Sequence, residues 1–79
     1  MKRTIADLLQ LIATHKMRPA TEDDNPWFFG PGVYSVDLGD DLLMIGKDPE
    51  SEDYVLFYQT IEGCLDYRVS FEKVLDELS

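Results

Sequence analysis

The spacing of apolar residues changes twice along this 79-residue chain, and the two changes limit the folds open to it. Residues 4–16 repeat apolar side chains at the interval of an amphipathic helix, residues 33–69 mostly alternate them as strands do, and residues 71–78 return to helical spacing. Helices at both ends of a run of neighbouring strands predict an α+β fold rather than an alternating α/β one.

Both expected helices have recognisable starts. Thr4 and Asp7 have the spacing of a capping box, so the first helix is expected at about residues 4–16. Ser70 is the expected N-cap of a second helix at about residues 71–78.

The middle of the chain predicts two β-hairpins joined by a break that contains Pro49. Turn residues occur at Gly39-Asp40-Asp41 and at Glu62-Gly63. The expected strands are at about residues 33–38, 42–46, 54–61 and 64–69. They predict a four-stranded antiparallel sheet in the order αββββα, within a single domain of residues 1–79.

Both faces of this expected sheet are apolar. One face, which should pack on the helices, takes Tyr34, Val36, Ile45, Val55, Phe57, Leu65, Tyr67 and Val69. The opposite positions offer Leu42, Met44, Tyr54, Leu56 and Tyr58, a set too apolar to face water alone. The cover could be the aromatic segment 27–29, one helix, a second copy of the chain or another partner, and the sequence leaves these alternatives open.

Charge and cysteine content exclude several classes of protein. Sixteen acidic and seven basic side chains give a net charge of -9, which disfavours direct binding to nucleic acid or to anionic membranes. No apolar run approaches the roughly 20 residues that span a bilayer, so a soluble protein is expected. Cys64 has no cysteine partner within the chain, which excludes a disulfide scaffold and favours the cytoplasm.

No catalytic or metal-binding motif is present in the sequence. Cys64 and His15 occur once each and would have to meet in space to act as nucleophile and base. Residues 48–53 alternate oxygen ligands, but Asp53 and Gln59 stand where a calcium-binding EF-hand needs Gly and Glu. We therefore expect no enzyme, no cofactor and no metal site.

The negative charge is unevenly distributed. Residues 1–18 hold four basic side chains and one acidic one, a charge of +3, while residues 19–79 carry -12. Most acids lie in three segments, 22–24, 37–41 and 48–53, which would form one negative patch if they met at one edge of the sheet. The candidate contact residues are Glu22, Asp23, Asp24, Asp40, Asp41, Asp48, Glu50, Glu52 and Asp53.

The long loop at residues 19–32 contains an aromatic run, Trp27, Phe28 and Phe29. Such residues either close the core of a small domain or anchor a partner at an interface. Both interpretations remain open at this stage.

These features favour a small, acidic, non-enzymatic module that binds a basic protein. Inhibitors, immunity proteins and nucleic-acid mimics share this combination of size and acidity. The alternative is a homodimeric structural or accessory protein that associates through the second apolar face of its sheet, with the acidity serving solubility.

Overall fold

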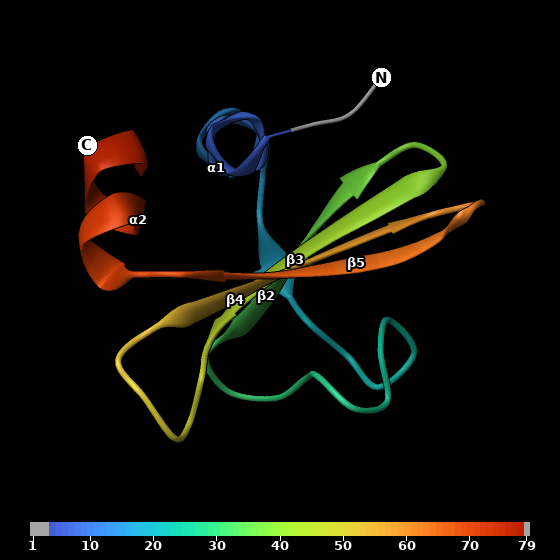
Figure 1. The fold of residues 1–79 in the computed structure, drawn as a ribbon. Helices are drawn as coiled ribbons and strands as arrows, with labels where there is room; N and C mark the ends of the chain where they lie inside the picture. Colours follow the sequence, from blue (N-terminus) through green and yellow to red (C-terminus); the bar gives the residue numbers. More distant parts are fainter. Residues whose placement is uncertain (1–3, 79) are drawn as a thin grey trace.

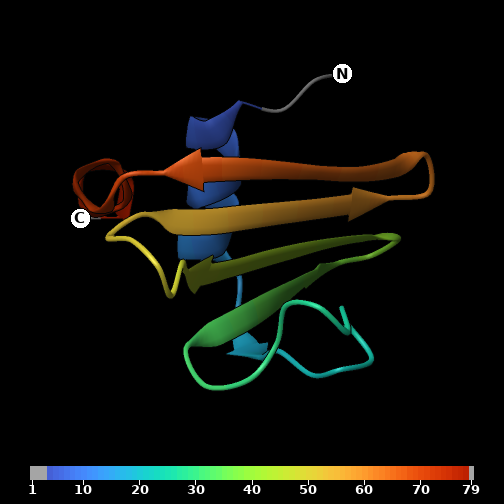
Figure 2. The same ribbon diagram turned by 60° about the horizontal axis from the view of Figure 1, so that its bottom comes forward.

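The computed structural model describes residues 4–78 as an antiparallel five-stranded sheet with both helices on one side (Figure 1). The elements are α1 (Ile5–Thr14), β1 (Arg18–Pro19), β2 (Val33–Leu38), β3 (Asp41–Lys47), β4 (Tyr54–Thr60), β5 (Gly63–Val69) and α2 (Phe71–Leu78). The strands lie in sequence order from β1 to β5, and α1 crosses behind them (Figure 2). The expected α+β class, with a helix at each end of an antiparallel sheet, is confirmed.

Helix α1 begins as its sequence predicts. The backbone N–H of Asp7 donates to the Thr4 hydroxyl at 3.1 Å, and the backbone N–H of Thr4 donates to the Asp7 carboxylate at 2.9 Å. The helix ends at Thr14, two residues earlier than expected, because His15 adopts an extended conformation that leads the chain towards β1.

Helix α2 has the expected bounds and is tied to α1. Its N-cap is Ser70, whose hydroxyl accepts the backbone N–H of Lys73 at 3.2 Å. The Gln10 side-chain amide donates to the backbone carbonyl of Glu77 at 2.9 Å, which links the two helices over one face of the sheet.

The expected four strands are corrected to five. Arg18 and Pro19 pair antiparallel with Ser35 and Tyr34, so β1 occupies a position where the sequence predicted the start of a loop. Proline has no N–H for a ladder and is therefore tolerated in a strand only at the sheet edge, which is where β1 lies.

The other four strands lie within one residue of their expected bounds, and both hairpins close with two-residue turns. Gly39 and Asp40 connect β2 to β3, and the φ of 76° at Gly39 is the left-handed conformation that glycine adopts readily. The second turn consists of Ile61 and Glu62, because Thr60 and Gly63 already pair. It therefore lies one residue before the expected Glu62-Gly63.

The expected side-chain faces are wrong for β4. Leu56 pairs with Ile45 and Tyr67, and it belongs with Tyr58 to the core beneath the helices. Val55 and Phe57, which were expected in that core, face the opposite side. The buried core beneath the helices consists of Leu8, Leu9, Ile12, Val36, Leu43, Ile45, Leu56, Tyr58, Val69 and Val74.

Loop 20–32 covers part of the opposite face of the sheet (Figure 1). A second buried cluster forms there from Ala20, Val33 and Met44, with Phe28 packed against it. The sequence left open what covers this face of the sheet. In the structure one ring of the aromatic segment, that of Phe28, covers it over β2 and β3. The part of this face on β4 and β5 stays more open.

The Phe28 ring packs directly against Gly46. A Cβ atom at this position would lie 2.9 Å from Phe28 Cζ and 2.9 Å from Val33 Cγ2, closer than packed carbon atoms approach each other. We expect Gly46→Ala to destabilise the protein by about 1 to 3 kcal/mol, although alanine normally suits a strand better than glycine does. Urea denaturation would measure the change.

The control is the same substitution made in a Phe28→Ala background. There the cost of Gly46→Ala should fall, because one of the two close contacts is gone. An equal cost in both backgrounds would contradict this packing of the loop on β3.

Candidate functional site

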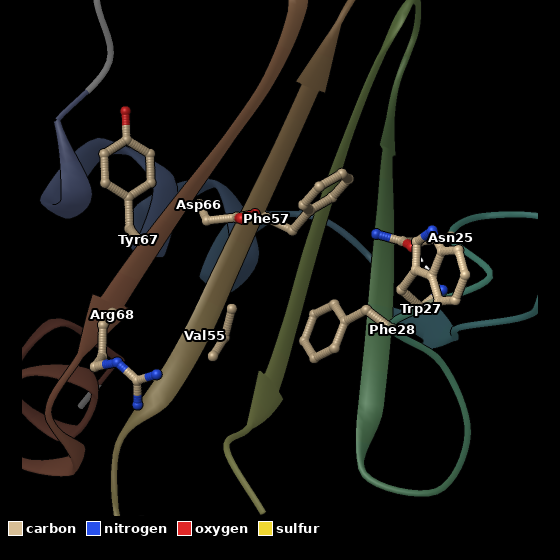
Figure 3. Close-up of a pocket in the computed structure, with 8 residues that line it drawn as sticks. All are labelled: Asn25, Trp27, Phe28, Val55, Phe57, Asp66, Tyr67 and Arg68. Atoms are coloured by element: carbon tan, nitrogen blue, oxygen red, sulfur yellow. Dashed lines mark hydrogen bonds between the residues drawn. The ribbon is translucent and has the colours of Figure 1, made fainter.

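An open groove of about 570 Å³ lies on the loop side of the sheet, between the aromatic loop and strands β4 and β5 (Figure 3). It is lined by Asn25, Trp27, Phe28, Val55, Phe57, Asp66, Tyr67 and Arg68. Of these, Tyr67 lies at the border of the groove, because its side chain packs against the core on the helix side. Sequence reasoning identified two of these residues, Trp27 and Phe28. Val55 and Phe57 were missed because they were assigned to the helix side, so they were not expected to share a face with Asp66 and Arg68.

The aromatic loop directs its rings in different directions. The side-chain carbonyl of Asn25 accepts the backbone N–H of Trp27 at 2.9 Å, and the backbone carbonyl of Asn25 accepts the N–H of Phe28 at 3.2 Å. In this turn Phe28 packs on the sheet, while Trp27 remains 93% exposed and Phe29 is also exposed. Phe28 is therefore part of the fold, and Trp27 is available for contact at the rim of the groove.

Arg68 connects the groove to the acidic loop between β3 and β4. Its guanidinium bonds to the carboxylate of Asp48, which also accepts the backbone N–H of Glu50 at 2.9 Å. The Glu50 N–H and then Arg68 hold the pKa of Asp48 below its usual value. The bond to Asp48 raises the pKa of Arg68. Glu50 and Asp53 lie in the same loop next to Asp48, whose carboxylate accepts the Glu50 N–H and whose own N–H donates to the Asp53 carbonyl at 2.9 Å.

Carboxylates therefore outnumber cations at this end of the groove. We call Asp48, Glu50, Asp53 and Asp66 the acidic rim; Asp66 lines the groove, and the other three act on Arg68. Arg68 and Lys47, whose ammonium group donates to the Ser51 carbonyl in the same loop, are the two cations there among the described residues, so four carboxylates against two cations leave the rim negative. Glu52, also proposed from the sequence, lies exposed in the same loop.

The three acidic segments do not meet at one edge of the sheet. Asp41 begins β3 and Asp48 follows its last residue, so the two loops lie at opposite ends of that strand, roughly 20 Å apart for seven extended residues. Asp40 is exposed in the far hairpin turn, and Asp41 accepts the hydroxyl of Tyr58 at 2.7 Å. These two candidates are thus separated from the acidic rim.

Asp24 is used inside the fold. Its carboxylate accepts two hydrogen bonds from Arg18, at 2.8 and 2.7 Å, one from the Thr21 backbone N–H at 2.9 Å and one from the Ser35 hydroxyl at 3.0 Å. Arg18 also bonds to Asp37 at 2.8 Å. The cluster fixes the start of the loop to β1 and β2. Glu22 and Asp23 are exposed in the turn just before it.

The Arg18 hydrogen bonds hold the pKa of Asp24 far below its usual value, against the opposing effect of burial, and the Thr21 N–H and Ser35 hydroxyl add to the lowering. Arg18 likewise lowers the pKa of Asp37. Both carboxylates are ionised at neutral pH, and the charge of Arg18 compensates one of the two.

The single cysteine and histidine lie outside the groove lining. Cys64 is exposed on β5, and the His15 ring lies 3.0 Å from the Leu11 carbonyl at the end of α1, as expected for a histidine at a helix end. Within residues 4–78, no group of three or more metal-ligating side chains comes together, and no helix combines the length and apolar character needed to cross a membrane.

The groove thus offers aromatic rings, the apolar side chain of Val55 and a negative rim, the chemical groups of a recognition surface. Searches of protein-family models, curated proteins and solved structures find no match to this chain.

Proposed function

We propose that the protein is a non-enzymatic binding module that docks a basic partner protein at the groove. The observation that carries this proposal is Trp27, which is 93% exposed beside an apolar groove with an acidic rim. Tryptophan is enriched among the residues that dominate binding energy at interfaces. A large apolar side chain exposed on so small a domain is accounted for if a partner covers it.

Charge supports a basic partner rather than an acidic or neutral one. The whole chain carries -9, and the acidic rim places part of that charge next to the groove. Such a field accelerates the encounter with a cationic surface and weakens as salt screens it. An acidic module that occupies the basic surface of a nucleic-acid-binding protein would inhibit it, and we propose this inhibitory role, in the cytoplasm.

The test compares Trp27→Ala with Ile61→Ala. Both residues are large, apolar and almost fully exposed, at 93% and 89%, but Ile61 lies in the hairpin turn outside the groove lining. Wild-type protein and both variants would be immobilised to capture partners from a native lysate at low and high salt. The captured protein would then be purified for affinity measurements.

We expect a basic partner whose affinity falls about thirtyfold with Trp27→Ala, equivalent to about 2 kcal/mol, and changes little with Ile61→Ala. Its association rate should fall as salt rises. A partner that binds both variants equally, or whose association rate ignores salt, would contradict the proposal. A salt-insensitive homodimer disrupted by Trp27→Ala would instead assign the groove to a second copy.

A further inference from the structure

Strand β5 forms an open edge of the sheet, next to the groove. Among residues 4–78 it pairs with β4 alone, and Figure 2 shows it at the edge opposite to β1. Most of its residues are exposed, although the strand is as long as β3 and β4. A strand in this position presents a row of backbone groups to which another chain can bond.

The hairpin geometry identifies these backbone groups. Because the turn has two residues, Thr60 and Gly63 are the hydrogen-bonded pair that closes it. Alternate residues then bond to β4 in the same way, and the residues between them turn their N–H and C=O outwards. Cys64, Asp66 and Arg68 are the outward-bonding residues of β5.

The two edges of the sheet differ in their protection. At the β1 edge the strand has two residues, one of them Pro19, and the Arg18 side chain is held by two carboxylates. Strand β5 contains neither proline nor lysine, and of its two charged residues, Asp66 and Arg68, the second is bonded to Asp48. One edge is thus closed to a further strand, while the other is free.

Side chains beside the free edge indicate what would pair there. On the groove side, Asp66 belongs to the acidic rim, and the charge of Arg68 on the same side is already paired with Asp48. On the helix side, Leu65 is 52% exposed. A strand added to β5 would place its side chains alternately next to these two surfaces. Basic side chains suit the first surface and apolar side chains suit the second.

We propose that the basic partner docks through an extended segment of alternating basic and apolar residues, which adds to β5 as a sixth strand. This proposal rests on the proposed function and specifies how the partner is held. Backbone hydrogen bonds to β5 supply affinity, and the alternation of side chains supplies specificity. A second copy of the chain suits the edge less well, because it brings a further charge of -9.

The probe is an end-blocked peptide of alternating lysine and valine, titrated into isotope-labelled full-length protein. Three control peptides accompany it: the same sequence with every second backbone nitrogen methylated, a proline-interrupted peptide of equal charge, and alternating glutamate and valine. NMR would record the chemical shifts and hydrogen exchange of the β5 amides. Light scattering would report the oligomeric state of the free protein.

We expect the lysine–valine peptide to bind and to slow exchange at the outward amides of Cys64, Asp66 and Arg68. Methylation of the backbone nitrogens that would face β5 should weaken binding at least about tenfold, and so should the proline interruption. The glutamate peptide should not bind. Absence of binding, or equal binding of the peptide that is methylated on the edge facing β5, overturns strand addition. If the Trp27-dependent capture persists in that case, the proposed function stands without it.

Protection of the β5 amides that is already present in the free protein and disappears on dilution would show that a second copy occupies the edge, and would also overturn the proposal.

Discussion

Leu56→Asp is expected to unfold the protein. Leu56 is 0% exposed in the core beneath the helices, so the change removes its packing, worth about 2 to 5 kcal/mol, and buries a carboxylate without a partner, which costs several kcal/mol more. A domain of this length has a total stability of about 4 to 12 kcal/mol. Circular dichroism should show no cooperative melting transition at neutral pH.

The matched control is the neighbouring substitution Val55→Asp. Val55 is only partly buried, on the groove side, and its pairing partner on β5 is Arg68, which would lie opposite the new carboxylate. We expect this variant to fold, with a loss of about 1 kcal/mol. If Val55→Asp unfolded and Leu56→Asp did not, β4 would have the opposite face towards the helices.

Asp24→Ala is expected to destabilise the protein by about 2 to 3 kcal/mol and to release the aromatic loop. The Ser35 hydroxyl, which is 0% exposed, would lose its carboxylate acceptor, and Arg18 would keep only Asp37. Urea denaturation measures the stability, and partner capture tests whether the groove depends on this anchor. The exposed neighbour Asp23 supplies the control, since Asp23→Ala should change stability by less than about 0.5 kcal/mol.

The same pair of variants has a defined pH dependence. Because the folded pKa of Asp24 lies below its unfolded value, its contribution is fully present above the unfolded pKa of about 4. It is lost as pH falls from there towards the folded pKa. The stability difference between wild type and Asp24→Ala should therefore shrink below about pH 4. A difference that stays constant to low pH would show that the carboxylate acts through something other than its charge.

Local sequence signals predicted the local structure well. Thr4 with Asp7 determined where α1 begins, and Ser70 determined where α2 begins, because each supplies side-chain partners to backbone groups that a helix end leaves free. The hairpins followed from Gly39 and from alternating hydrophobicity. Such signals involve residues only a few positions apart, so no knowledge of the folded chain is needed to use them.

The face of β4 could not be assigned from hydrophobicity, because both parities are apolar. The turn carries the missing information: a two-residue turn places each even-numbered residue of β4 opposite an odd-numbered residue of β5. Once Leu65, Tyr67 and Val69 are assigned to the helix side, Leu56 must accompany them. The pairing of β1 had no such signal, since two residues ending in Pro19 do not resemble a strand.

For the candidate site, the sequence predicted the residue types but not which residues would lie together. The acids at Asp41 and Asp48 are close in sequence, yet β3 separates them by its full length. Asp24 was proposed as a contact residue, but Arg18 and Ser35 engage its carboxylate within the fold. The groove brings Trp27 next to residues of β4 and β5 that are about 30 to 40 positions away in the chain, an arrangement that depends on the order of the strands.

The unequal edges of the sheet also bear on stoichiometry. A sheet with two free edges can recruit chains at both and grow without limit, which leads to fibres. Here the proline and the short length of β1 close one side, so that an addition at β5 leaves no second site for the protein to extend the assembly. The architecture favours a finite complex with one bound strand per molecule.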